Sequence, residues 1–165
     1  METTIPKRPH SRDPDIMEAA AARMVEGVRE KFDGLSDEEI AKGLRHALAR
    51  AMSLDGYDIA RRLENDNLCE PDAEMVEMLD TAYGYVFQAH REAVKGWVRG
   101  NNITLKRKVG DRIRYREEAG AIGEIDPELA AYLFRPDGDT RFEKGGGIYV
   151  TEEDAKDIEP AGVAS

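Results

Sequence analysis

Few residues of this chain have the types and the spacing that chemistry requires. The histidines His10, His46 and His90 have no carboxylate or cysteine at metal-ligand spacing, and the sequence contains neither H-E-x-x-H nor C-x-x-C. The one cysteine, Cys69, stands between a turn and Pro71 without the signature of a nucleophile. We therefore expect solvated or capped histidines, a half-buried thiol, and neither a metal nor another cofactor.

Carboxylates and glycines suggest two further kinds of chemistry. Acids that work as a general acid and base need burial and close approach to shift their pKa values, but the acids here lie in charge-dense stretches. The run Gly145-Gly146-Gly147 lacks the lysine and hydroxyl of a phosphate-binding loop and precedes an expected strand. We interpret it as a hairpin loop, and we do not expect the chain to be an enzyme.

Size and composition limit the class of protein. A chain of 165 residues with 41% hydrophobic and 35% charged residues fits a soluble globular protein with one ordinary domain or two small ones. It has no apolar run of about 18 residues, and we expect neither a membrane span nor a secretory signal. One cysteine cannot form an internal disulfide, so we expect the bacterial cytoplasm. The net charge of −10 argues against bulk binding to nucleic acid.

Acidic residues gather in one stretch that lacks bases. Between Arg62 and Arg91 there is no lysine or arginine, and the acids of this stretch are Glu64, Asp66, Glu70, Asp72, Glu74, Glu77 and Asp80. They form either a solvated helix face or a face that imitates nucleic-acid phosphates and binds a basic groove on a protein partner.

Basic residues gather in a second, shorter stretch, where only Asp111 is acidic: Lys106, Arg107, Lys108, Arg112, Arg114 and Arg116. The stretch could bind phosphates or an acidic partner, with Tyr115 available for stacking. Alternatively, it keeps an edge strand soluble and pairs with the acids of residues 64–80. We favour the second interpretation for the strand. Lys106 to Lys108 precede the strand, however, so the alternation of exposed and buried residues along it does not explain their charge.

Helical signals occupy the first part of the chain. Residues 1–12 are expected to form a flexible arm, and a helical domain over residues 13–100 follows. Asp13-Pro14 opens the first helix, a capping box at residues 36–39 opens the second, and a short third follows Asp55-Gly56.

The last helical stretch runs from Pro71 to about Arg99, with an apolar side that includes Tyr83. It predicts either one long helix of about 28 residues or a helix bent or broken at Gly84.

After residue 103 the apolar period changes to two, which predicts strands. We expect a linker at 101–108, a β-domain over 109–160 and a tail at 161–165. The expected strands lie at 112–116, 121–125, 132–134, 141–143 and 148–150, with a turn at 136–138. A single helical turn at 151–154 and the last apolar anchor, Ile158, complete the domain.

The β-domain resembles a known family. Val109-Gly110-Asp111-Arg112-Ile113, followed by residues 120–125 (GAIGEI), is similar to the opening strands of KOW and Src-homology-three-like small barrels. The short helical turn near the end is similar to the way such barrels close. The resemblance covers a third of the chain and implies a small β-barrel, whose surface aromatics would be Tyr115, Tyr132 and Tyr149. Ribosomal, transcriptional, chromatin and architectural roles all occur on this fold.

The sequence thus predicts an α+β protein, with a helical bundle that ends in a long helix followed by a small barrel. The whole looks like an accessory protein of a phage or mobile element. Our leading hypothesis is a non-enzymatic inhibitor, similar to anti-CRISPR proteins, that binds a nucleic-acid-handling host complex through the acidic helix face. One alternative is a virion or assembly component that docks through the barrel. The other is a regulatory nucleic-acid-binding protein that uses residues 106–116. A protein partner is expected, and the oligomeric state stays open.

Overall fold

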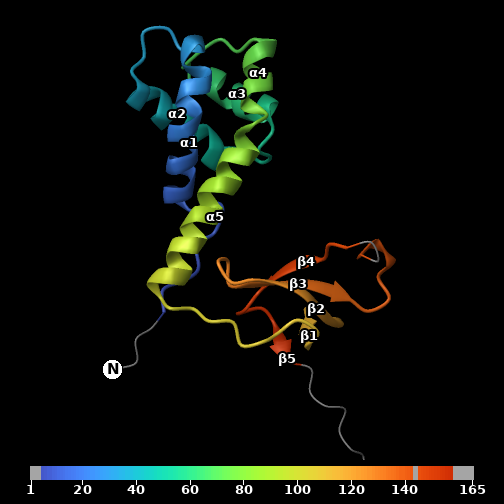
Figure 1. Ribbon diagram of the computed structural model, residues 1–165. Coiled ribbons are helices and arrows are strands. Elements are labelled where there is room, and N and C mark those ends of the chain that lie inside the picture. Colours follow the sequence, from blue (N-terminus) through green and yellow to red (C-terminus); the bar gives the residue numbers. More distant parts are fainter. Residues whose placement is uncertain (1–4, 143–144, 158–165) are drawn as a thin grey trace, which may run out of the picture. The chain divides into compact units, whose positions relative to one another are not determined.

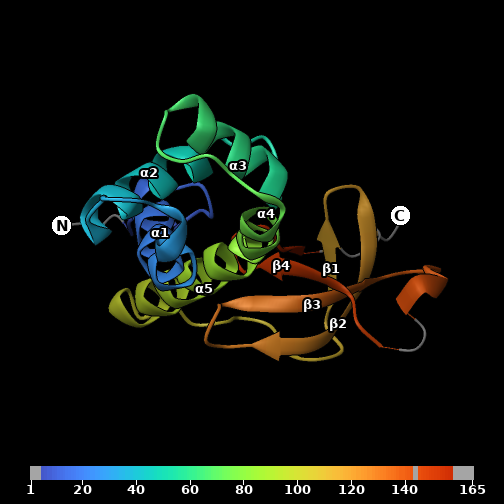
Figure 2. The same ribbon diagram turned by 90° about the horizontal axis from the view of Figure 1, so that it is seen from above.

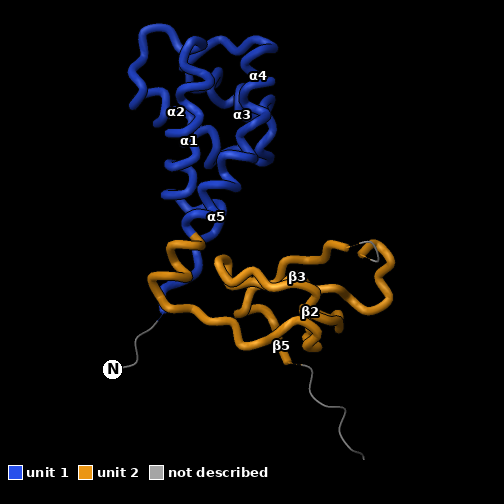
Figure 3. Tube along the Cα trace, viewed as in Figure 1, with its two compact units in different colours: residues 1–93 blue, residues 94–165 orange. Residues whose placement is uncertain are grey.

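The computed structural model describes residues 5–142 and 145–157, and the chain divides into two compact units (Figure 3). The first unit comprises residues 1–93 and is helical. The second comprises residues 94–165 and contains an antiparallel sheet. A mixed helix-and-strand fold, with the helices first, was predicted from the periodicity and is confirmed.

The helical unit is built around one apolar core. Its elements are α1 (Pro14–Val28), the 3-10 turn η1 (Arg29–Lys31), α2 (Asp37–Arg50), α3 (Gly56–Asn65), α4 (Ala73–Leu79) and the first part of α5 (Ala82–Gly100) (Figures 1 and 2). The largest fully buried side chains of this core include Met17, Met24, Leu44, Leu48 and Met75. Arg23 of α1 also pairs with Glu92 of α5 at 2.5 Å.

Local capping explains where these helices begin. The predicted box at α2 is present, because the Glu39 N–H donates to Ser36 Oγ at 3.3 Å and the Ser36 N–H donates to the Glu39 carboxylate at 2.8 Å. Asp55 accepts from the N–H of Asp58 and caps α3 in the same way. These side chains satisfy donors that have no partner inside the helix.

The last helical stretch is broken, and the break does not lie at Gly84. Helix α4 ends at Leu79 and α5 begins at Ala82, so a single helix from Pro71 is wrong. The cause is a contact with α3: the Gly56 N–H donates to Asp80 Oδ1 at 2.5 Å, and the Gly56 Cα sits against the Val76 carbonyl. Gly84 lies inside α5, where an added Cβ would meet nothing within 4 Å.

The second unit is a curled five-stranded antiparallel sheet, a half-barrel, in the order β4-β3-β2-β1-β5. Its strands are β1 (Arg112–Tyr115), β2 (Glu118–Asp126), β3 (Ala131–Pro136), β4 (Ile148–Thr151) and β5 (Lys156–Asp157) (Figure 1). The 3-10 turn η2 (Thr140–Phe142) comes before β4. Its core consists of Ile113, Ile122, Tyr132, Phe134, Val150 and Ala155.

Two details of the sheet differ from the sequence prediction. Residues 140–142 form a 3-10 turn instead of a strand, because the Asp139 carboxylate accepts from the Arg141 N–H, and Glu143 lies outside the described residues. The turn predicted after β4 is present, because the Ala155 N–H donates a hydrogen bond to the Thr151 carbonyl. A strand that was not predicted, β5, follows this turn. Ile158 lies outside the described residues.

The two units divide earlier than the expected boundary near Gly100. Val94 and Val98, on the last turns of α5, are buried with Ala130, which precedes β3. Ile103 and Leu105, expected in a linker, are partly buried against the same cluster. The end of α5 therefore packs with the second unit. Among the described helices none has the length and apolar character needed to span a membrane.

Candidate interaction surfaces

The seven acids of residues 64–80 do not form one helix face. They come from the end of α3, the following loop and α4, where Asp66 and Asp72 are cap residues. Four of them have internal roles. Lys31 pairs with Asp72 at 2.8 Å and with Glu74 at 2.5 Å, Arg50 pairs with Asp66, and Asp80 accepts from Gly56.

The hydrogen bond from Lys31, together with that from the Met75 N–H, lowers the pKa of Asp72. The other three acids, Glu64, Glu70 and Glu77, are exposed and have no side-chain hydrogen bond or ion pair within the described part of the chain.

Two arginines of the basic stretch form ion pairs with acids of the sheet unit. Arg112 binds the Asp137 carboxylate with both terminal nitrogens, one of them at 2.6 Å. Arg107 pairs with Glu152 and with Asp157, each at 3.0 Å. The expected partners were the acids of residues 64–80. The strand order explains the difference, because β1 lies between β2 and β5 and so comes close to acids of its own unit.

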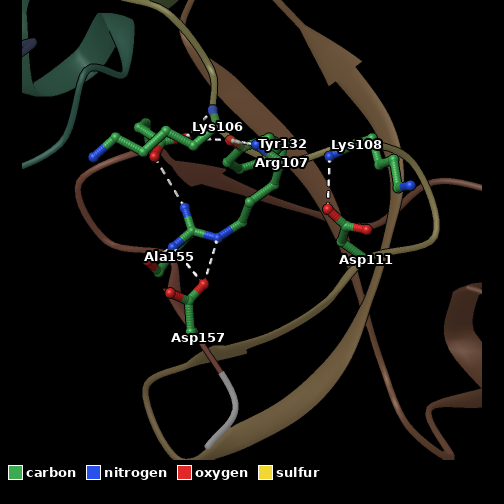
Figure 4. Close-up of polar contacts among 8 residues, drawn as sticks. Lys106, Arg107, Lys108, Asp111, Tyr132, Ala155 and Asp157 are labelled. Carbon is green, nitrogen blue, oxygen red and sulfur yellow. Dashed lines mark hydrogen bonds and ion pairs between the residues drawn. The ribbon is translucent and has the colours of Figure 1, made fainter.

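Arg107 is the centre of a dense polar network (Figure 4). Its side chain also donates to the Ala155 carbonyl at 2.9 Å, and its backbone N–H donates to the Tyr132 hydroxyl. Burial disfavours its charged form, but the hydrogen bonds to Asp157 and Tyr132 and the field of Glu152 outweigh burial and raise the pKa of Arg107. The side chain of Arg107 therefore holds together parts of the sheet unit and is not free to bind a ligand.

Arg114 is on the same exposed side of β1 as Arg112, but it has no ion pair within the described part of the chain. Arg114 is paired in register with Ala119 of β2 and with Lys156 of β5. In the next row of the sheet, Ala121 of β2 lies opposite both Arg112 and Arg135.

The aromatics expected on the barrel surface differ in their exposure. Tyr132 is fully buried, because it lies on the core side of β3, and its hydroxyl donates to Glu152. Tyr115 is half-buried. Its ring packs edge-on against Phe134, with the ring centroids 6.2 Å apart, and the Arg116 guanidinium lies over its face. Only Tyr149 presents its ring widely, at 61% exposure.

A second group of exposed apolar side chains lies in the helical unit, and we did not predict it. Tyr83 and Phe87 are stacked on α5 with ring centroids 6.3 Å apart, and they are 65% and 49% exposed. Tyr57, on the first turn of α3, is 68% exposed, and Met52, just before α3, is 90% exposed. The spacing of four residues between Tyr83 and Phe87 was the available sequence signal.

The histidines and the cysteine occupy ordinary structural positions. His90 Nε2 lies 3.1 Å from the Pro9 carbonyl oxygen, and His10 Nδ1 accepts from the Arg12 N–H. Cys69 is half-buried with Met75 Sδ at 3.8 Å, and burial, helped by the charge of Glu64, raises its pKa to about 11. Among the described residues no three histidine, cysteine or acidic side chains gather as metal ligands would.

Comparisons with models of protein families, with curated proteins and with solved structures found no match for this chain.

Proposed function

We propose that this protein is a non-enzymatic interaction protein whose helical unit binds a protein partner. The observation that carries the proposal is the group of exposed side chains Met52, Tyr57, Tyr83 and Phe87, here called the aromatic patch. Tyrosine, phenylalanine and methionine are enriched at protein interfaces, because each buries a large area when a partner covers it.

The fold brings these residues to one region of the helical unit. Gly56, which precedes Tyr57, donates to Asp80 at the junction of α4 and α5, and Tyr83 lies on the first turn of α5. Met52 is held to α3 by its N–H, which donates to the Asp58 carboxylate at 2.7 Å. The start of α3 therefore lies beside the junction of α4 and α5, and Asp80 at this junction is three residues before Tyr83.

The charge around the patch favours a basic partner. Asp55 and Asp58 lie at the first turn of α3 with Tyr57, and Asp80 ends α4 just before α5. Glu77 lies on α4 and has no ion pair within the described residues. Carboxylates next to exposed rings complement a surface rich in lysine and arginine, since both groups attract cations. A protein that handles nucleic acid has such a surface, so an inhibitor of a nucleic-acid-handling complex is the specific form of this proposal.

We also propose that the sheet is a small barrel of the KOW and Src-homology-three-like type. Three local features that carried the resemblance support this. Gly110 has a φ of 91° in the turn that enters β1, and Gly120 packs against the Arg135 carbonyl, where a Cβ has no room. A single turn at residues 151–155 precedes the last strand.

A quantitative pull-down from bacterial lysate tests the partner-binding proposal. We expect Tyr83→Ala/Phe87→Ala to lose the proteins that the native chain retains, because the rings form the centre of the interface. Val109→Ala shortens an exposed apolar side chain of the other unit and is the control. Retention of every partner by the double variant, with an unchanged circular dichroism spectrum, would show that the patch is not the interface.

A second variant separates charge from apolar contact. Glu64→Gln/Glu70→Gln/Glu77→Gln changes the three exposed acids that have no side-chain hydrogen bond or ion pair within the described residues, so we expect little change in stability. If complementary charge contributes, this variant forms the complex more slowly, and the difference from the native chain decreases as salt is added.

A further inference from the structure

The sheet gathers cations from three separate strands on its outer face. Arg114 of β1 is opposite Lys156 of β5, and Arg135 of β3 shares a row with Ala121 and Arg112. Residues that are directly opposite on neighbouring strands point to the same side, with Cβ atoms about 5 Å apart. The core side chains Ile113 and Phe134 alternate with these cations along β1 and β3, which places the cations on the solvent side.

The pair formed by Arg114 and Lys156 has no explanation in the fold. Like charges directly opposite each other destabilise a sheet. Neither side chain has an acid within ion-pair distance in the described part of the chain, whereas Arg107 and Arg112 each have one. An unneutralised pair of this kind is stabilised when an anion binds.

The remainder of the face includes two acids that are paired with its other arginines, Asp137 with Arg112 and Glu124 with Arg135 at 4.0 Å. Ala119 and Ala121 lie between the charged positions, and their short side chains let a backbone come close to the sheet. Tyr149 is opposite Leu133, which is on the same side of β3 as Arg135, so its exposed ring belongs to this face.

We propose that the outer face of the sheet binds single-stranded nucleic acid. Its phosphates contact Arg114 and Lys156, and one base stacks on Tyr149. Single strands offer phosphates and free base faces together, and proteins bind them with cations and aromatic rings. A duplex keeps its bases stacked, and an acidic peptide has no base to stack, so neither uses Tyr149. DNA and RNA share both contacts, and the face therefore binds both. The surface is on the sheet unit and is independent of the aromatic patch.

The net charge of −10 sets the conditions of the test. Repulsion between the acidic chain and the polyanion slows their association, whereas the cations of the outer face attract phosphates at short range. We therefore expect binding at about 50 mM salt that weakens as salt is added. Contact with two phosphates gives a slope of log K against log salt of about −1.4 on a single strand.

Fluorescence anisotropy with labelled oligothymidine and oligouridine of about 16 nucleotides tests the cations on the full chain. We expect Arg114→Glu/Lys156→Glu to weaken binding more than tenfold. The matched control, Lys42→Glu/Arg61→Glu, makes the same change of net charge on exposed residues of the helical unit and should change the affinity little. Arg114→Gln is a milder variant that needs no acid on the sheet, and it should give a smaller loss in the same direction.

The Tyr149 variants test the single-strand assignment. Tyr149→Ala should weaken oligothymidine binding about tenfold and leave binding to a duplex of equal length unchanged, while Tyr149→Phe keeps the native affinity. Unchanged oligothymidine binding by Tyr149→Ala, or tighter binding to the duplex, would overturn the single-strand assignment. Absence of oligonucleotide binding, native affinity in the Arg114→Glu/Lys156→Glu variant, or equal competition by polyglutamate would overturn the site itself.

Discussion

Arg107 and Glu152 form an ion pair of 3.0 Å in which the two side chains are only 14% and 10% exposed. The pair joins the segment before β1 to the turn between β4 and β5. Tyr132, at the centre of the sheet core, donates to the same carboxylate, and the Lys106 N–H donates to it as well. Glu152 therefore accepts from three residues, and the network depends on its charge.

Removal of Arg107 should destabilise the sheet unit strongly. Arg107→Ala leaves the Glu152 carboxylate nearly buried without its cation, and loss of one partner of such a pair costs about 3 kcal/mol of unfolding free energy. Urea unfolding followed by circular dichroism measures this loss. Arg112→Ala, which removes an ion pair on the exposed side of the sheet, should have a much smaller effect. Equal losses for the two variants would contradict the role of the network.

The break between α4 and α5 can be tested with two glycine substitutions. Gly56→Ala should destabilise the helical unit by about 3 kcal/mol, because its Cβ would overlap the Val76 carbonyl and Asp80. Gly84→Ala should stabilise it by up to about 1 kcal/mol, because alanine is the better helix former and its Cβ meets nothing. Thermal unfolding distinguishes the two. A stable Gly56→Ala variant would show that the contact between α3 and the junction is not tight.

Cys69 should be unreactive in the folded protein. With a pKa of about 11 it carries almost no thiolate at pH 7, and the thiolate is the reactive form. We expect iodoacetamide to modify it far more slowly in the folded chain than in urea, as measured by mass spectrometry. Rapid modification under native conditions would mean that the thiol is less buried than its contact with Met75 implies.

Acid should weaken the contact between Lys31 and Asp72. The pKa of Asp72 is lowered in the folded state, so its stabilising effect is present above the unfolded pKa and is lost as the pH falls through the folded value. Asp72→Asn keeps a capping side chain and removes the charge. It should lower the melting temperature by a few degrees at pH 7 and reduce the further loss below about pH 4.

Glu77→Gln is the control for this experiment. It removes an acid of α4 that has no ion pair among the described residues, so the pH dependence of its melting temperature should match that of the native chain. A matching profile for Asp72→Asn would contradict the role of the Lys31 contact.

Features that depend on neighbouring residues were predicted well from the sequence. The capping box at Ser36 and Glu39 and the turn at residues 136–138 are local, and both are present. Alternation also placed Arg112 and Arg114 on the exposed side of β1. Features that depend on distant contacts were missed. The helix break at Asp80 is caused by Gly56, and β5 is a strand only because it pairs with β1.

The same distinction applies to the candidate sites. Composition identified the acids of residues 64–80, but it could not show that Lys31 and Arg50 are their partners. Strand pairing adds Arg135 and Lys156 to the basic face and removes Arg107 from it. Tyr83, predicted on the apolar side of its helix, is exposed, because Ala82, Val86 and Ala89 form the buried side of α5.

The network around Arg107 has a consequence for synthesis on the ribosome. Arg107 cannot form its ion pair until Glu152, which is 45 residues further along the chain, has been synthesised. The helical unit closes its own core before that point, and domains fold in order as they emerge. The nascent sheet therefore stays open, with its core exposed, until that point, and premature termination before Glu152 should yield a folded bundle with an unfolded, protease-sensitive extension.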